Sequence, residues 1–114
     1  MAYHVQHVQL IGDAAADETA NINLLKDGNR LPENIMYVHQ ASATMDNNET
    51  LNITGKMVGV DTAVTANVHA ELTMTASQVI RLDLSTEAKG FWQLTFTAVQ
   101  LDTDQTIDIW IITW

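Results

Sequence analysis

The chain has 114 residues, 46% of them hydrophobic and 17% charged, and its 14 acidic and 5 basic side chains give a net charge of -9. This length predicts one domain, residues 1–114, whose core needs no metal or disulfide, and the absence of cysteine excludes thiolate chemistry. The five cations are scattered, which argues against nucleic acid and anionic membranes as partners, because both require clustered positive charge.

The first twelve residues, MAYHVQHVQLIG, contain no Lys or Arg followed by an apolar run, so they lack the pattern of a secretory signal. No stretch of the sequence approaches the roughly 20 apolar residues that a membrane-spanning helix needs. We therefore expect a soluble protein that is made in the cytoplasm.

Alternation of apolar and polar residues, the period of a strand with one buried face, is the main pattern of the chain, and it first predicts a strand at 3–11. The next segment has two interpretations. Asp13 to Gly28 is either a short helix, with Asp13 as its N-cap, or an Ala-rich loop followed by a strand at 20–26. The loop and strand are favoured, because Asn21 and Asn23 are poor helix formers.

Further strands are predicted at 35–45, 51–59 and 64–76. The pattern is clearest in the third of these, where the even-numbered residues from Val64 to Ala76 are apolar and the odd-numbered ones are threonines or other polar residues. We expect a long, half-buried strand with one solvent-exposed, Thr-rich face.

Strands at 80–85 and 92–101 follow. In the second of them Trp92 is in phase with Leu94 and Phe96, which predicts that its ring faces the core. The apolar phase then switches to Val99 and Leu101, which predicts a β-bulge near Ala98.

The last predicted strand, 107–114, is apolar on both faces near its end, with isoleucines on one side and Trp110, Ile112 and Trp114 on the other. Either both faces are covered within the domain, or one face contacts another chain. Tryptophan is enriched at interfaces, so we predict an interface that contains Trp110, Ile112 and Trp114, together with Tyr3 near the other terminus. Packing of the tryptophans in the core is the alternative.

About eight strands with turn residues between them, such as Asp27-Gly28-Asn29 and Asp102-Thr103-Asp104-Gln105, predict an all-β, antiparallel β-sandwich of the jelly-roll or Greek-key type. The order of the strands within the sheets does not follow from the pattern.

Few polar residues form a catalytic or metal-binding pattern. His4 and His7 have a ligand-like spacing, but residues three apart on a strand point to opposite faces and do not bind one ion. His39 is isolated, and His69 is two residues from Glu71 on the polar face of its strand, where the two side chains are expected to be in contact. No serine has the context of a nucleophile, so we predict that the protein is not an enzyme and has no catalytic residue.

Residues 102–108 carry oxygen side chains at alternate positions, like the start of a calcium loop. Ile107 replaces the glycine of the sharp turn, and no glutamate follows at the twelfth position, so an acidic hairpin is favoured over a calcium site. No metal ligand and no cofactor is predicted.

Three features carry a resemblance: the signal-less start Met1-Ala2-Tyr3, the Thr-rich strand at 64–76 and the strand-final Trp114. In overall character the chain resembles the small all-β virion proteins of tailed bacteriophages, especially capsid decoration or cement proteins. None of these features is a family motif, so no site residue is transferred. The resemblance implies a homo-oligomer, most often a trimer, that sits on a capsid shell and holds neighbouring subunits together. It also implies that the protein is located in the virion after it is made in the host cytoplasm; the cytoplasm is the alternative location.

A ligand-binding β-sandwich of the carbohydrate-binding or adhesion type is the alternative function. Such modules display aromatic rings on which sugars stack. With Trp92 predicted to face the core, the remaining tryptophans form a poor platform for a sugar.

Overall fold

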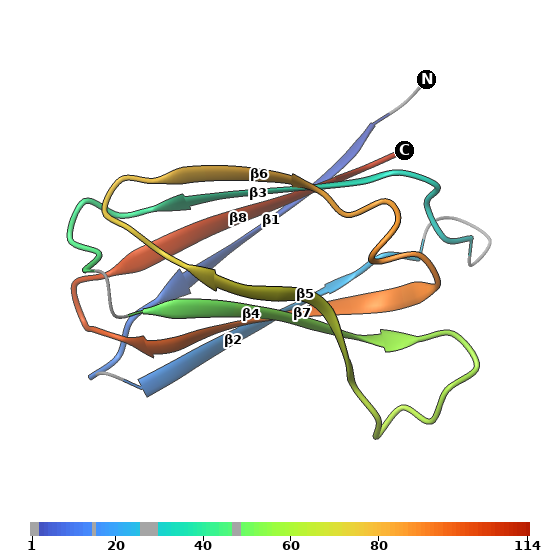
Figure 1. Cartoon of the computed structure of the whole chain (residues 1–114), viewed down its shortest axis with the longest axis horizontal. Helices are drawn as coiled ribbons and strands as arrows, with labels where there is room; N and C mark the ends of the chain where they lie inside the picture. The colour runs from blue at the N-terminus through green and yellow to red at the C-terminus, as the bar shows by residue number, and fades with distance from the viewer. Residues whose placement is uncertain (1–2, 15, 26–29, 47–48) are drawn as a thin grey trace.

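The computed structural model describes residues 3–14, 16–25, 30–46 and 49–114 and shows two four-stranded sheets packed face to face (Figure 1). Sheet A contains, in spatial order, β1 (His4–Ile11), β8 (Thr106–Thr113), β3 (Ile35–Ala41) and β6 (Val79–Asp83). Sheet B contains β2 (Ala16–Asn23), β7 (Phe91–Leu101), β4 (Thr50–Met57) and β5 (Ala66–Thr73). The predicted all-β sandwich is confirmed, and the described part of the chain has no helix long and apolar enough to span a membrane.

The strand pairing is that of one long hairpin rolled around a core. All pairs are antiparallel: β1 pairs with β8, β2 with β7, β3 with β6 and β4 with β5. Rolling the hairpin adds two more pairs, β3 with β8 and β4 with β7, and these pairs complete the two four-stranded sheets. This nested arrangement is a jelly roll, one of the two topologies that the sequence left open.

The core lies between the sheets and is built from the alternate residues that each strand turns inward, as the two-residue period requires. Its buried apolar residues are Leu10, Ile22, Leu24, Ile35, Tyr37, Ala41, Met45, Leu51, Ile53, Val68, Met74, Leu84, Ala88, Phe91, Leu94, Phe96, Ala98, Leu101, Ile107, Ile109 and Ile111. Ile107, Ile109 and Ile111 of β8 therefore occupy the buried face of the strand, as their phase predicted.

The ambiguous segment 13–28 contains a strand, so the helix alternative is wrong. β2 runs from Ala16 to Asn23 and begins four residues before the predicted strand at 20–26. Pairing with β7 turns Ile22 into the core and leaves Asn21 and Asn23 exposed, which fits a strand face better than a helix. The predicted turn at 27–29 lies outside the described residues.

β5 is shorter and more exposed than the sequence predicted. It spans Ala66–Thr73, not 64–76, and Val68 is its buried apolar residue. The pairing of β5 with β4 contains two register shifts. Ala70 is exposed, although its phase predicts burial. The physical reason is its position: β5 is an edge strand of sheet B, where irregular pairing is common.

Trp92 does not face the core, which corrects the sequence prediction. In the pairing with β4, Lys56 is opposite Gln93 and Met57 is opposite Phe91, so Trp92 is the extra residue of a bulge. Phe91 takes the inward position and is buried, whereas Trp92 is half-buried.

The second bulge of β7 was predicted and is confirmed. Between Ala98 and Leu101 this strand has one residue more than β2 has between Glu18 and Ala16. Gln100 adopts a left-handed φ of 57° in the bulge, and its N–H donates to Asp17 Oδ1 at 3.0 Å. The bulge therefore restores the inward position of Leu101.

The remaining strands lie close to their predicted ranges, with β3 the most shortened. β3 ends at Ala41 instead of residue 45, because Ser42 to Met45 form a turn in which the Met45 N–H donates to the Ser42 carbonyl at 3.2 Å.

Candidate interaction surface

The outer face of sheet A, the side turned away from sheet B, is defined by the strand register. Trp110 of β8 is opposite His7 of β1, and Ile112 is opposite Val5 and Met36. Directly opposed residues share one face of an antiparallel pair. Alternate residues complete this face, which contains Tyr3, Val5, His7, Gln9, Ile11, Met36, Val38, Gln40, Val79, Arg81, Asp83, Thr106, Asp108, Trp110, Ile112 and Trp114.

All four residues of the predicted interface lie on this outer face. The ring of Tyr3 meets that of Trp114 edge to face at a centroid distance of 5.2 Å. The imidazole of His7 stacks on the indole of Trp110 at 4.9 Å, with the ring planes 28° apart. Ile112 lies between the two tryptophans on the same side of β8.

The alternative of core packing does not hold for these residues. Trp110, Ile112 and Trp114 are half-buried and do not belong to the core cluster, and Tyr3 keeps 64% of its surface exposed. The indoles of Trp114 and Trp110 contact the rings of Tyr3 and His7 on the same face.

A continuous apolar patch covers the β1, β8 and β3 part of the face. It consists of Tyr3, Val5, Met36, Val38, Trp110, Ile112 and Trp114, and we refer to these seven residues as the apolar patch. Arg81 and Asp83 of β6 are opposite Val38 and Met36 and form a charged border on one side. An apolar centre with a polar rim is the usual layout of a protein interface.

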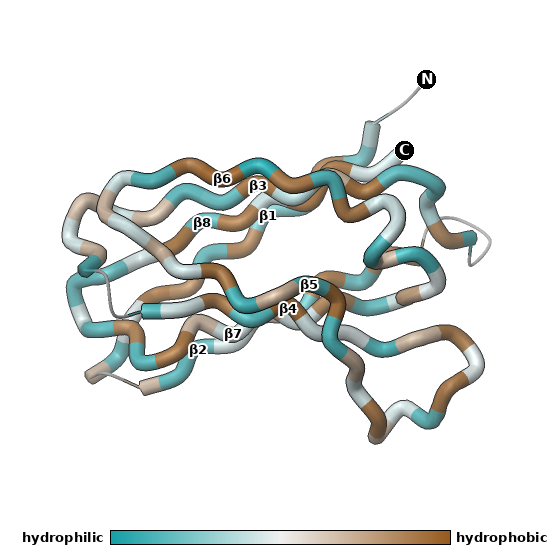
Figure 2. Tube along the Cα trace, viewed as in Figure 1, coloured by the Kyte–Doolittle hydropathy of each residue, from teal (hydrophilic) through white to brown (hydrophobic). Residues whose placement is uncertain are grey.

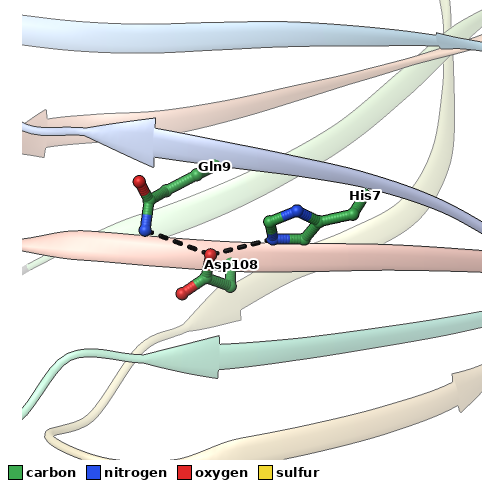
Figure 3. A network of polar contacts seen from close by, with 3 residues as sticks. All are labelled: His7, Gln9 and Asp108. Carbon is green, nitrogen blue, oxygen red and sulfur yellow. Dashed lines mark hydrogen bonds and ion pairs between the residues drawn. The ribbon is translucent and has the colours of Figure 1, made fainter.

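A polar network borders the patch toward the start of β8 (Figure 3). The Asp108 Oδ1 atom lies 2.9 Å from His7 Nε2 and accepts a hydrogen bond of 3.1 Å from Gln9 Nε2. His7 is held by this contact on one side and by the indole of Trp110 on the other. The network therefore fixes the orientation of the ring that covers Trp110.

The outer face of sheet B has the opposite character. Its central strands carry threonines and amides, and Thr95 Oγ1 donates to Asn21 Oδ1 at 2.7 Å across β7 and β2. The residues that face outward here include Thr19, Asn21, Asn23, Thr50, Asn52, Thr54, Lys56, Gln93, Thr95 and Thr97. The outer face of sheet B is thus mainly polar, whereas the outer face of sheet A has an apolar centre.

The histidines do not form a common site. His4 is opposite Thr113 and His7 is opposite Trp110, so the two rings start from different sides of β1, as the strand period predicts. The predicted contact of His69 with Glu71 is wrong: His69 Nδ1 lies 2.7 Å from Glu87 Oε2, in the loop between β6 and β7. The bulges of β5 account for the difference, because they shift its side chains out of the regular alternation.

His39 lies inside the sandwich. Its Nδ1 atom is 2.7 Å from the hydroxyl oxygen of Tyr37, and its Nε2 atom is buried without a hydrogen-bond partner. Burial lowers the pKa of His39 to about 4 and raises that of Tyr37 above its ordinary value. The neutral imidazole is therefore the form that the fold accommodates.

A group of three carboxylates lies at one end of the sandwich, and sequence reasoning missed it. Asp46 and Glu49 come from the β3–β4 connection and Asp102 from the β7–β8 turn, and their oxygens lie within 4.8 Å of one another. Of the acidic residues in the 102–108 segment, Asp102 joins this group, whereas Asp108 lies on the outer face of sheet A. The calcium-loop spacing along the sequence is therefore not the arrangement in space.

A shallow apolar hollow lies beside the bulge of β7. It is lined by Trp92, Leu25, Val58, Val60 and neighbouring residues of the β4–β5 connection. Figure 2 shows the apolar residues of this connection at the end of the molecule. Val58 and Val60 are exposed there, so the hollow is open to solvent and Trp92 forms one wall.

The comparisons with known proteins give a fold but no family. No protein-family model matches the chain, and no curated protein matches it. Among solved structures the chain is similar to YomS, a protein derived from the SPBc2 prophage, with a TM-score of 0.57 and 8% identity over 99% of this chain and 96% of the other. It is also similar to the K1 cleaved adhesin domain of Lys-gingipain from Porphyromonas gingivalis W83, with a TM-score of 0.50, 14% identity and coverage of 99% and 98%. At these identities the likeness is one of fold alone.

Proposed function

We propose that the protein is a structural component of a virion, of the capsid decoration or cement type, which associates through the outer face of sheet A. The observation that carries this proposal is the apolar patch with its two tryptophans on a face that no part of the described chain covers. Exposed apolar patches with polar rims mark contact sites for other proteins. The fold similarity to a prophage-derived protein supports a phage-related origin, which this proposal assumes.

The size of the face is adequate for a subunit contact. Four strands about 4.8 Å apart and about eight residues of 3.3 Å each give a projected area of about 500 Å². A standard interface buries about 800 Å² of accessible surface on each partner, and accessible area exceeds projected area on a surface made of side chains. The outer face of sheet A therefore accommodates one partner subunit. In the trimer that we favour, this face contacts a different surface of the next subunit, because a ring of three is built from head-to-tail contacts.

The partners in this proposal are copies of the same chain and a larger protein shell, and the protein resides in the virion with no catalytic role. Its acidity favours a neutral or basic docking surface on the shell. Neither nucleic acid nor membrane is a partner in this model.

The test compares matched lysine substitutions on the two sheets. Val5→Lys places a charge in the apolar patch at a side chain that is 56% exposed, so the fold should tolerate it. Thr19→Lys places the same charge on β2, which is also an edge strand, but on the polar face of sheet B. Light scattering after size exclusion should show an oligomer for the wild type and Thr19→Lys, and a monomer for Val5→Lys.

Two results contradict the proposal. A wild-type monomer at millimolar concentration contradicts self-association. An oligomer that persists in Val5→Lys shows that the subunits meet at another surface. Trp110→Ser and Trp114→Ser extend the test to the centre of the patch, with circular dichroism to confirm that the variants are folded.

A ligand-binding module of the adhesion or carbohydrate-binding type is the second candidate, and the position of Trp92 favours it. The half-buried ring lines an open hollow instead of the core, so an aromatic surface is available to a sugar. The fold similarity to an adhesin domain is in line with this candidate. A glycan array with wild type and Trp92→Ala tests it: specific binding that Trp92→Ala loses supports the module, and an empty array contradicts it.

A further inference from the structure

The three carboxylates at the end of the sandwich come from loops that are far apart in sequence and tied together in space. The link is Gln105, which is buried: its Oε1 accepts from the Asp102 N–H at 2.9 Å, and its Nε2 donates to the Thr44 carbonyl at 3.2 Å. Thr44 Oγ1 donates in turn to the Asp104 carbonyl at 2.6 Å. The β3–β4 connection and the β7–β8 turn are thus held against each other beside the carboxylates.

Glu49 gives a second and independent observation that points to a ligand. Its side chain is almost wholly buried, at 3% exposure, and its Oε2 atom has no hydrogen-bond partner in the described part of the chain. A buried carboxylate oxygen without a partner is costly, because it has lost its water and received nothing in exchange. Its backbone is fixed by a bond of 3.1 Å from the Met74 N–H to the Glu49 carbonyl.

The surroundings of Glu49 do not balance its negative charge. Asp46 lies beside the carboxyl group, so the nearest charged neighbours of Glu49 are the other two acids of the cluster. Within the described residues, no Lys or Arg forms an ion pair with Glu49 or Asp102. A bound cation would supply the missing positive charge.

The spacing fits a calcium ion. Calcium binds six to eight oxygens at 2.3–2.6 Å, so two ligands on opposite sides of one ion are about 4.8 Å apart. The three carboxylate oxygens lie within 4.8 Å of one another, which places all of them within reach of one ion. Magnesium requires a nearly ideal octahedron at shorter distances, which ligands from two loops satisfy less readily.

We propose that Asp46, Glu49 and Asp102 bind a calcium ion that joins the β3–β4 connection to the β7–β8 turn. Water completes the coordination shell on the exposed side, where Asp46 is solvent accessible. The ion is a structural clamp on one end of the jelly roll, and the site is independent of the function proposed for the outer face of sheet A.

The experiment titrates the full chain, freed of metal with EDTA, with calcium chloride and with magnesium chloride, and reads both the heat of binding and the melting temperature. Calcium should bind with one saturable site and raise the melting temperature by several degrees at 100 times the Kd, since a ligand that binds only the folded state stabilises it. Magnesium at the same concentration should raise it less.

Matched variants locate the site. Glu49→Gln and Asp102→Asn should each weaken calcium binding at least tenfold, whereas Glu71→Gln, an exposed acid of β5, should bind like the wild type. Asp102→Asn keeps the test valid if Glu49→Gln does not fold, because Asp102 is only half-buried. The proposal is overturned if 10 mM calcium gives neither heat nor a thermal shift, if magnesium gives an equal shift, or if Asp102→Asn responds like the wild type. In the first case Asp46 and Glu49 share a proton instead of a metal ion.

Discussion

The buried pair of Tyr37 and His39 makes a quantitative prediction about stability and pH. His39 is fully buried, its Nδ1 atom is 2.7 Å from the Tyr37 hydroxyl oxygen, and its Nε2 atom has no partner. The perturbation is acidification from pH 7 to pH 4, applied to the wild type and to the double variant Tyr37→Phe/His39→Leu. This variant replaces both polar groups with apolar ones of similar size.

The direction follows from proton binding. The pKa of His39 is 6.5 in the unfolded chain and is lowered by burial to about 4 in the folded one. Between these values the unfolded chain binds a proton that the folded chain refuses, so the free energy of unfolding falls as the pH falls. The loss begins near pH 6.5 and is complete below pH 4. At about 1.4 kcal/mol for each pH unit of this window, it amounts to about 3 kcal/mol.

Urea denaturation followed by tryptophan fluorescence measures the effect at pH 7, 6, 5 and 4. Carboxylates also titrate at the acidic end, but they do so in both proteins, so the difference in free energy of unfolding isolates His39. We expect the free energy of unfolding of the double variant, relative to that of the wild type, to rise by about 3 kcal/mol between pH 7 and pH 4. A difference that stays constant within about 0.5 kcal/mol refutes the reasoning, because His39 then keeps its ordinary pKa in the fold.

The single variant Tyr37→Phe is the control for the hydrogen bond. It removes the partner of Nδ1 while Nε2 already lacks one, so both ring nitrogens are left unsatisfied. At pH 7 this should cost about 1–3 kcal/mol, and the double variant should cost less, since removing both partners leaves no orphaned group.

Three further variants test the packing. Gly12→Ala should lower the free energy of unfolding in urea by about 3 kcal/mol or more, because a Cβ atom there would lie 1.6 Å from the Asp102 carbonyl oxygen. A near-neutral result would contradict the close approach of Gly12 to Asp102. Ile109→Ala should cost about 2–5 kcal/mol by opening a cavity between the sheets, and a cost below 1 kcal/mol would place Ile109 outside the core. Asp108→Ala should cost less than about 1 kcal/mol, since its contact with His7 is partly exposed, and a larger loss would show that the network supports the fold itself.

The sequence by itself determined the class of fold and the two faces of most strands. The two-residue period requires that Ile107, Ile109 and Ile111 share one face and that Trp110 and Ile112 share the other, whatever the strands pair with. The bulge near Ala98 was also predictable, because a bulge leaves a change of phase in the pattern. Local sequence is enough for these features, since they depend on residues that are adjacent along one strand.

The alternation of apolar and polar residues gave a wrong prediction where the pairing between strands changes which side a residue faces. Trp92 has the phase of a core residue, but Gly55 lies opposite Leu94, and the Phe91 ring occupies the space beside it, which pushes Trp92 outward. A Cβ atom on Gly55 would lie 2.7 Å from that ring. The fit of Phe91 against this glycine is a contact between residues 36 positions apart in sequence, and no pattern within β7 contains it.

The tertiary structure alone decided which sites exist. It brought Tyr3 onto Trp114 and His7 onto Trp110, because the first and last strands of the rolled hairpin are neighbours in sheet A. It also joined Asp102 to Glu49, although the spacing along 102–108 suggested a different set of oxygens. Sequence fixes the side of a strand on which a residue lies, through the geometry of the backbone. Which distant residue it meets depends on how the whole hairpin rolls, and the global packing of the core decides that.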